Sequence, residues 1–302
     1  MDTREAWSPE GFEEYRELYP STPELSPAPD PEPTRRFTDL WNEGGSAIAN
    51  SVRARANDTT LVFARGFLGS YMPGNLEAPC LASRRLGFDA FVASQRPGGS
   101  VAENVKSLAR ELETRDSRHR LVFCGHSRGG LECLTLLANR SDLSARCDGV
   151  VLSQTARGPS RVLESVLQGL HRQRLSRWRR GTEFAQRISL RILGADKGGQ
   201  ELTSSAWPDL VRRLDGIAWP FPVLQTASWS TRPTAWLDSF HERLGEIGPG
   251  RAHDGQFFLH DLIWPRFPHV LLPRLDHAQP AMGGLGFDHA RYWLAVLRMV
   301  LP

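Results

Sequence analysis

Short apolar runs that alternate with helical patterns constrain the fold of this chain more than any other feature. Six runs of five to seven residues are spaced along the sequence, at 60–66, 88–94, 121–125, 149–155, 221–227 and 269–275. Helical patterns separate several of them, and one begins at Ser100, a typical N-cap residue. Strands that alternate with helices form a mostly parallel sheet with helices on both faces. The sequence therefore predicts an α/β fold built on such a sheet.

Two segments fall outside this alternation. Residues 1–36 contain a proline-rich stretch, and we expect them to form an extension that lies outside the folded domain. Residues 156–218 show helical patterns where the strand rhythm is interrupted, and an insertion at this point suits a cap over a pocket. The expected organisation is an N-terminal extension at 1–36 and one domain at 37–302, which carries a helical cap or lid at about 156–218.

Composition and charge argue against several classes of function. The chain has 302 residues and a formal net charge of +3, which is too small to indicate a nucleic-acid partner. Its four cysteines lack the spacing of zinc or redox motifs, so reduced packing thiols are expected. Acidic residues stand where a secretory signal needs positive charge, and no apolar run reaches membrane-spanning length. We expect a cytoplasmic protein that needs no metal or cofactor.

A basic run lies inside the helical insertion. Five arginines alternate there with apolar residues that include Trp178: Arg172, Arg174, Arg177, Arg179 and Arg180. A solvated helix face is the simpler interpretation of this pattern. Contact with a lipid surface or with another anionic partner is the alternative.

The run at 121–125 leads directly into Gly125-His126-Ser127-Arg128-Gly129, which Gly130 follows. A serine with a glycine two residues before it and two after it is typical of a nucleophile elbow, a strained turn between a strand and a helix. Glycines let the strand and helix approach closely, and free N–H groups at the helix N-terminus favour developing negative charge. Because short patterns also arise by chance, the position between an apolar strand and a helical pattern is what favours Ser127 as a nucleophile.

An oxyanion hole is expected beside this serine. The first apolar run ends in a loop that contains Gly66 and Gly69. Such a loop can direct the N–H of Phe67 toward the same point as the N–H of Arg128. A plain glycine turn after a strand is the alternative interpretation.

A serine nucleophile also needs a base, which in this arrangement follows late in the chain. His277 comes directly after the last apolar run and opens a loop rich in proline and glycine, so it is the preferred base. His289 falls in the expected closing helix and is the reserve candidate. His269 comes too early, because it starts the last apolar run.

The acid that orients the base is harder to assign. Asp254 lies in a glycine-flanked loop between the last two apolar runs and is preferred. A loop aspartate beside a glycine is also a typical turn former, which is the alternative role. Asp238 and Asp261 remain as further candidates.

These motifs resemble those of the α/β-hydrolase superfamily, and within it the bacterial triacylglycerol lipases and related esterases. The similarity covers about residues 58–302 and rests on the oxyanion loop at 64–70, the elbow at 125–130, a loosely similar turn at 154–160, His253-Asp254-Gly255 and the pair Asp276-His277. Arg65 stands where the family usually has a histidine, and the usual Pro-His turn is missing. The secretion signal and disulfide of secreted lipases are not apparent. Some members bind structural calcium, but this sequence assigns no ligands for it.

The resemblance implies a serine hydrolase that cleaves carboxylic esters, of small molecules or of lipids, through an acyl-enzyme on Ser127. The apolar wall of an acyl pocket is expected to come from the insertion: Leu163, Leu167, Leu170 and Trp178. Cleavage of thioesters, amides or polyesters by the same triad stays open, because a fold does not set the substrate. A non-catalytic binding protein on the same scaffold is the alternative of a different class, and the oligomeric state stays open.

Overall fold

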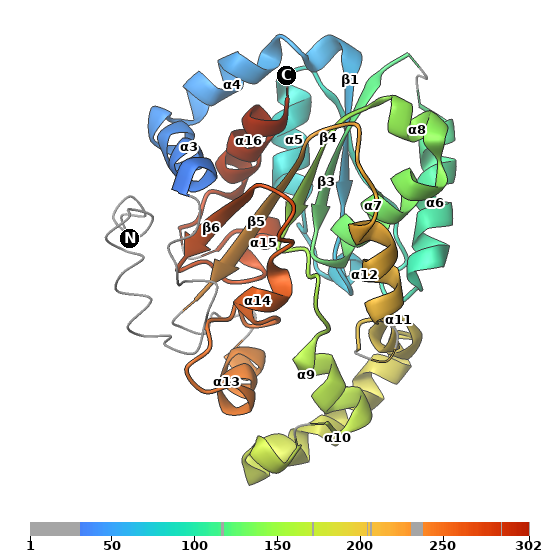
Figure 1. The fold of residues 1–302 in the computed structure, drawn as a ribbon, viewed down its shortest axis with the longest axis vertical. Helices are drawn as coiled ribbons and strands as arrows, with labels where there is room; N and C mark the ends of the chain where they lie inside the picture. Colours follow the sequence, from blue (N-terminus) through green and yellow to red (C-terminus); the bar gives the residue numbers. More distant parts are fainter. Residues whose placement is uncertain are drawn as a thin grey trace.

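A parallel sheet of six strands forms the centre of the structure, a computed structural model that describes residues 31–115, 118–170, 172–203, 205, 207–230, 238–284 and 286–301 (Figure 1). In chain order the strands are β1 (Thr59–Ala64), β2 (Asp89–Val92), β3 (Arg120–His126), β4 (Cys147–Ser153), β5 (Val223–Trp229) and β6 (His269–Pro273). They lie in the order β2-β1-β3-β4-β5-β6, and every neighbouring pair is parallel. Each expected run overlaps one strand, with ends that agree within two residues, so the predicted parallel sheet is confirmed.

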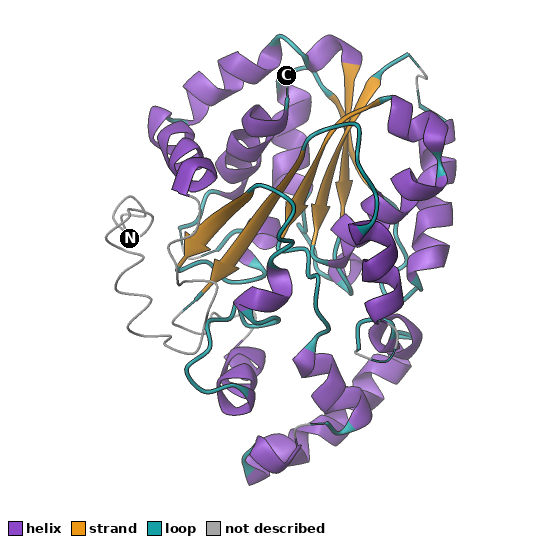
Figure 2. Cartoon of the chain, viewed as in Figure 1, coloured by secondary structure: helices purple, strands orange, loops and turns teal. Residues whose placement is uncertain are grey.

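Helices cover both faces of this sheet (Figure 2). One layer contains α3 (Pro31–Glu43), α4 (Gly45–Arg53), α5 (Glu77–Arg85) and α16 (His289–Val300). The opposite layer contains α6 (Val101–Glu113), α7 (Arg128–Asn139), α8 (Ser141–Ala145) and α12 (Trp207–Asp215). Successive strand residues point to opposite faces, so the adjacent Val62 and Phe63 belong to two different hydrophobic cores. Both faces of β1 and β3 are therefore buried.

The expected start of α6 is confirmed. The Ser100 hydroxyl accepts a hydrogen bond from the N–H of Glu103, and the Glu103 carboxylate accepts one from the N–H of Ser100 at 2.8 Å. This capping box satisfies two backbone donors at the N-terminus of the helix.

The insertion between β4 and β5 is helical, as predicted, and most of it lies beyond the carboxyl ends of the strands (Figure 1). This cap consists of α9 (Arg161–Leu163), a π-helical turn (Glu164–Gln168), a 3-10 turn (Arg172–Arg174), α10 (Arg177–Ile192) and α11 (Asp196–Gln200). The last helix of the insertion, α12, differs from the prediction. It buries Trp207, Val211 and Leu214 in the core beside α7, so it belongs to the sheet domain rather than to the cap.

The N-terminal boundary also differs from the prediction. Residues 1–30 lie outside the described part of the chain, but 31–36 form the start of α3 instead of an extension. Prolines are tolerated in the first turn of a helix, because the N–H groups there have no partner within the helix. The side chain of Thr34 accepts a hydrogen bond from the N–H of Leu271 at 3.0 Å, which fastens α3 to the edge strand β6.

All four cysteines are buried, and none is in a disulfide: Cys80, Cys124, Cys133 and Cys147. None of the described helices combines the length and the apolar character needed to cross a lipid bilayer.

Candidate functional site

The turn between β3 and α7 holds Ser127 in an unusual backbone conformation, with φ of 53° and ψ of −130°. Non-glycine residues rarely adopt a positive φ, and such strain clusters at functional sites. The glycines around it are required by close packing. A Cβ atom at Gly125 would overlap the backbone of Gly130, and one at Gly129 would overlap the carbonyl oxygen of Ala64. The sequence thus folds into an elbow that only glycines at these positions allow.

The loop after β1 lies directly against this serine. A Cβ atom at Gly66 would be only 2.8 Å from the Cβ of Ser127, so no other residue fits there without displacement. No described residue accepts a hydrogen bond from the N–H of Phe67, the next residue along. The N–H of Arg128 belongs to the first turn of α7, where backbone donors have no partner within the helix. Two unused N–H groups therefore flank Ser127.

His277 and Asp254 form a close pair at the carboxyl end of the sheet. Nδ1 of His277 donates to Oδ2 of Asp254 at 2.6 Å, and the N–H of His277 donates to the carbonyl oxygen of Asp254 at 2.9 Å. Asp254 is fully buried, and its Oδ1 accepts from the N–H groups of Gln256 at 2.8 Å and Phe257 at 2.9 Å. The Asp254 carboxylate therefore combines the two roles that the sequence left open, turn former and partner of the base. Its Oδ1 closes a turn, and its Oδ2 orients the imidazole of His277.

The other candidates lie elsewhere. Asp261, in α14 (Leu259–Leu262), lies 3.3 Å from the imidazole of His260. Asp238 is the first residue of α13 (Asp238–Ile247). His269 begins β6 and contacts the carbonyl oxygen of Phe267, and His289 begins α16. The structure pairs His277 with Asp254 and with none of the other candidate acids whose side chains it describes.

A cavity of about 350 Å³ opens over the elbow. Ser127, His277, Gly66 and Phe67 all line it, and the rest of its wall is mainly apolar, with Val162, Leu163, Val166, Leu190, Leu202 and Phe257 among the lining residues. The serine and the histidine therefore face one mostly apolar cavity beneath the cap.

Only one of the four leucine and tryptophan candidates for the acyl pocket lines this cavity, and it is Leu163. Leu167 packs behind the wall, against Val166 and Leu190. Leu170 follows Gly169, which turns the chain outward at φ of 69°, and its side chain is exposed. Trp178 is 78% exposed, because it lies on the outer side of α10. Apolar character alone did not reveal which side of each cap helix faces inward.

No protein-family model and no curated protein sequence matches the chain. Solved structures do resemble it. A metagenomic carboxyl esterase superimposes with a TM-score of 0.63 at 19% identity, over 81% of this chain and 76% of the esterase. The mature lipase BlEst2 of Bacillus licheniformis has a TM-score of 0.53 at 15% identity, over 76% of this chain and 89% of the lipase.

A phospholipase, PlaB from Legionella pneumophila, also resembles the chain. Its TM-score is 0.53 at 10% identity, over 78% of this chain and 59% of the phospholipase. The order of strands, the cap after β4 and these superpositions agree. The chain has the α/β-hydrolase fold.

His126 is a part of this candidate site that the sequence did not single out. Its Nε2 donates to the carbonyl oxygen of His277 at 2.7 Å, so it fastens the loop that carries the histidine to the elbow. Burial, together with the nearby His277, lowers the pKa of His126 to about 3. It is therefore neutral near physiological pH. The Gly-His-Ser sequence was visible, but nothing local indicated a contact 151 residues away.

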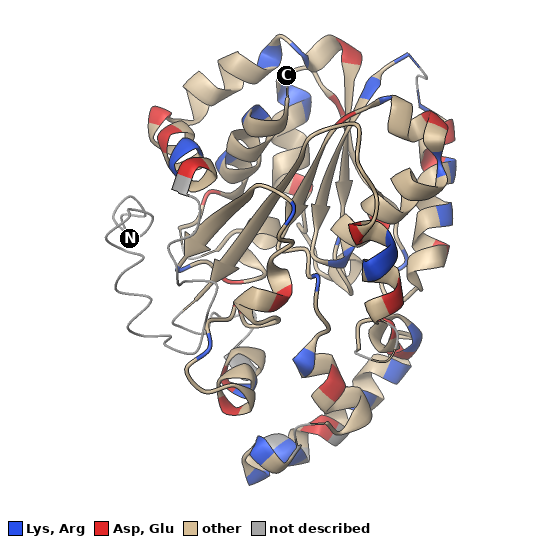
Figure 3. Ribbon diagram, in the orientation of Figure 1, with Lys and Arg blue, Asp and Glu red and all other residues tan. Residues whose placement is uncertain are grey.

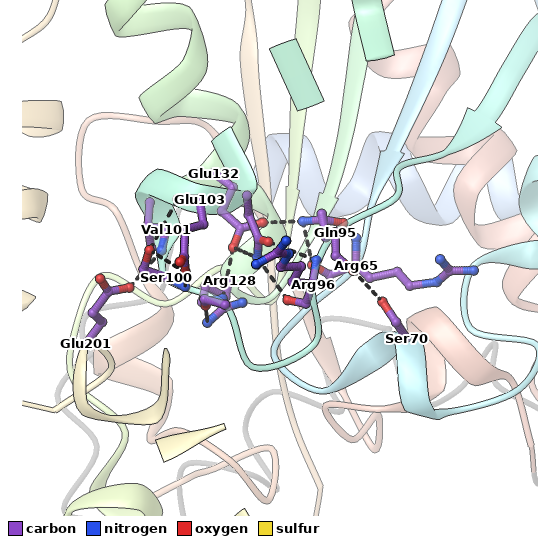
Figure 4. Close-up of polar contacts among 12 residues, drawn as sticks. Arg65, Ser70, Gln95, Arg96, Ser100, Val101, Glu103, Arg128, Glu132 and Glu201 are labelled. Atoms are coloured by element: carbon purple, nitrogen blue, oxygen red, sulfur yellow. Dashed lines mark hydrogen bonds and ion pairs between the residues drawn. The ribbon is translucent and has the colours of Figure 1, made fainter. Parts of the chain in front are cut away.

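A buried ion pair lies directly behind the elbow (Figure 4). The Arg128 guanidinium, whose side chain is 2% exposed, contacts the fully buried Glu132 carboxylate at 3.0 Å, one helical turn along α7. Glu132 also accepts hydrogen bonds from the side-chain amides of Gln95 and Asn104. Burial raises the pKa of the Glu132 carboxyl, whereas Arg128 and the two amides lower it. The carboxylate is thus surrounded by donors on three sides.

This network reaches the loop beside Ser127 by two routes. The Gln95 side chain makes two hydrogen bonds with the backbone of Arg65. Its Oε1 accepts from the Arg65 N–H at 2.6 Å, and its Nε2 donates to the Arg65 carbonyl oxygen at 3.1 Å. The Arg128 guanidinium lies 5.1 Å from the centre of the Phe67 ring and donates to the carbonyl oxygen of Gly99 at 3.0 Å. The residues that carry the two unused N–H groups therefore contact each other through their side chains.

Metal ligands are not gathered at this site. Within the described part of the chain, no group of three or more histidine, cysteine, aspartate or glutamate side chains is placed to hold a metal ion.

Proposed function

We propose that this protein is a serine hydrolase that cleaves carboxylic esters through an acyl-enzyme on Ser127. One observation carries the proposal: a buried Asp254–His277 pair at 2.6 Å shares an apolar cavity with a serine on a strained elbow. Solved structures that resemble the chain include a carboxyl esterase, a lipase and a phospholipase, and each of these names describes an enzyme that acts on esters. Their low identity makes the site geometry, rather than the likeness, the main support.

The reaction proceeds in two acyl-transfer steps. Because Nδ1 of His277 donates to Asp254, its Nε2 is free to accept the proton of the Ser127 hydroxyl. The serine oxygen attacks the ester carbonyl, and the N–H groups of Phe67 and Arg128 bind the oxyanion. His277 then returns the proton to the departing alcohol. Water, deprotonated by the same histidine, attacks the acyl-enzyme, and the proton passes back to Ser127 as the acid leaves.

Labelling with a fluorophosphonate, followed by peptide mass spectrometry, tests the nucleophile. We expect one adduct, on the peptide that contains Ser127, and an adduct on any other residue would overturn the proposal. Hydrolysis of p-nitrophenyl esters from acetate to palmitate, beside acyl-CoA and anilide analogues, tests the substrate class. Faster turnover of thioesters or amides than of every oxygen ester would contradict an esterase.

The neutral state of His126 leads to a prediction about pH. Its pKa of about 3 means that it does not change charge between about pH 5 and 8, so it should not contribute to the pH dependence of activity in this range. We expect the His126→Asn variant to lose activity on acidification with the same midpoint as the wild type, even if its kcat is lower. A pH profile of kcat/KM checks this, and a displaced midpoint would show that His126 itself titrates.

The Arg128–Glu132 pair is proposed to position the oxyanion hole. We expect Glu132→Gln to lower kcat by about 10²-fold, the cost typical of losing one oxyanion donor, with a smaller change in KM. The variant leaves the buried Arg128 cation without its counter-charge, so the network shifts behind Phe67. Affinity for a boronic acid, which mimics the tetrahedral intermediate, should fall in parallel with kcat.

A matched control for Glu132→Gln lies at the opposite end of the sheet. Asp148 is 12% exposed and contacts Arg55 at 3.3 Å and Arg120 at 2.6 Å, far from the elbow. Asp148→Asn should lower the melting temperature and leave kcat and boronic acid affinity unchanged. If Glu132→Gln behaves in the same way, its ion pair supports the fold only.

A further inference from the structure

Helix α10 of the cap buries polar side chains beside the apolar Leu190, which lines the cavity. Its side toward the protein holds Glu183, which is 3% exposed and accepts a hydrogen bond from the Ser165 hydroxyl at 2.6 Å. Gln186 on the same side accepts one at 2.8 Å from Arg243, which is 1% exposed. A surface helix normally buries its apolar residues and shows its polar ones to water. The inward side of α10 instead carries polar side chains beside an apolar one.

Four apolar residues of α10 face outward. Trp178, Ala185, Ile188 and Ile192, which we call the outer stripe, recur at intervals of seven, three and four residues and lie within about 80° of one another around the helix. All four are exposed, with Trp178 at 78% and Ile192 at 80%. Apolar side chains gathered on one face in this way mark a surface that binds a partner.

The charge beside the outer stripe is positive. Arg177, Arg180 and Arg191 are exposed and lie along one edge of the stripe by the helical repeat. Glu183 is the only acidic residue in the sequence of α10, and it is buried. Figure 3 shows basic residues gathered at the start of α10, at the end of the cap farthest from the sheet. The surface therefore combines apolar side chains with a basic edge.

The outer stripe continues to the mouth of the cavity. Leu193, directly after α10, is 40% exposed and also lines the cavity over Ser127. Its carbonyl oxygen accepts a hydrogen bond from the hydroxyl of Tyr71 at 3.0 Å, and Tyr71 is 50% exposed. Tyr71 ends the 3-10 turn Gly69–Tyr71, which begins two residues beyond Phe67. Whatever covers the stripe would thus lie at the entrance of the site.

We propose that α10 docks this protein on an anionic lipid surface through the outer stripe and its arginines. Arginine beside tryptophan and isoleucine on one helix face suits the interface of such a surface, because the apolar side chains insert while the arginines meet negative headgroups. The basic run in the sequence is then part of a lipid contact rather than a solvated face. Docking brings the cavity mouth to the lipid. The delivery of lipid esters to Ser127 rests on the proposed function, but the docking does not.

Co-sedimentation of the full chain with vesicles tests the docking. The Ser127→Ala variant is used so that lipid is not consumed, with vesicles of phosphatidylcholine alone or of equal parts phosphatidylcholine and phosphatidylglycerol. We expect binding to the anionic vesicles only. Trp178→Gln with Ile192→Gln should weaken it about tenfold or more, and Arg177→Gln with Arg180→Gln roughly thirtyfold.

Matched controls come from the sheet domain. Leu81 on α5 is 49% exposed, and Arg85 and Arg110 are exposed on α5 and α6. Leu81→Gln, and Arg85→Gln with Arg110→Gln, should bind anionic vesicles like the parent protein. Trp178 and Ile192 do not line the cavity. In protein that keeps Ser127, the Trp178→Gln and Ile192→Gln variants should therefore still hydrolyse p-nitrophenyl acetate at the wild-type rate. If the wild-type protein itself does not hydrolyse p-nitrophenyl acetate, the result would count against the proposed function and not against the docking.

Three results would overturn the docking proposal. The first is equal binding to both kinds of vesicle, or to neither. The second is an equal loss in the control variants. The third is a concentration-dependent dimer in analytical ultracentrifugation that Trp178→Gln with Ile192→Gln disperses, without vesicle binding, since the stripe would then contact a second copy of the chain.

Discussion

Replacing Ser127 with alanine is expected to lower kcat for ester hydrolysis by about 10⁶-fold, the loss typical of a serine hydrolase without its nucleophile. The hydroxyl is the atom that forms the acyl-enzyme, and neither His277 nor the oxyanion donors can replace it. The fold should survive, because alanine meets the same backbone constraint at φ of 53° and fits the space of the serine. Single-turnover hydrolysis of a p-nitrophenyl ester, together with thermal unfolding of the variant, measures both effects.

Ser83→Ala is the matched control for this variant. Ser83 is buried in α5, where its hydroxyl donates to the carbonyl oxygen of Pro79 at 2.9 Å. Its removal should leave kcat unchanged. Activity that remains in Ser127→Ala and is still blocked by a fluorophosphonate would mean that a different serine is the nucleophile.

The sheet could be predicted from the sequence because each buried parallel strand must be apolar on both faces. The run at 121–125 is an example, since β3 is buried along nearly its whole length between two helix layers. Such strands are short, continuous and separated by helical segments, and few folds other than a parallel sheet can bury them all. The order of the strands in the sheet, by contrast, could not be predicted, because the sequence of a single strand does not show which strands lie beside it.

The cap was harder to predict, because its helices bury polar residues. Trp178 was expected on the pocket wall, but the inward side of α10 carries Glu183, Gln186 and Leu190 instead. Periodicity shows which residues share a face and does not show which face is buried. A similar limit applies at Pro31, where proline composition suggested an extended chain although its position in a first turn permits a helix.

In the candidate site, too, some residues could be predicted from the sequence and others could not. Ser127 could be selected because elbow, strand and helix are contiguous in the sequence. Glu132 and Gln95 could not, because they meet across 37 residues and neither belongs to a motif. Asp254 was one of three aspartates, separated from His277 by 23 residues, and only the fold shows which of the described carboxylates reaches the imidazole.

Exchanging Asp254 for asparagine is expected to lower kcat by about 10⁴-fold near neutral pH. The carbonyl oxygen of an asparagine side chain can still accept from the N–H groups of Gln256 and Phe257, so the turn is kept. Its NH₂ group then faces Nδ1 of His277, which must become an acceptor. The ring proton moves to Nε2, and the imidazole can no longer accept the proton of Ser127. The variant should therefore fold normally and still fail as a catalyst.

Asp238→Asn and Asp261→Asn separate this role from a general effect of lost charge. Asp261 is 5% exposed and contacts His260, so its loss should affect stability and lower kcat by less than about tenfold. Measuring kcat and melting temperature for all three variants gives the test. A loss of about 10⁴-fold in either control, with Asp254→Asn near wild type, would move the orienting acid to that position, because only the residue that fixes the His277 tautomer can cost so much.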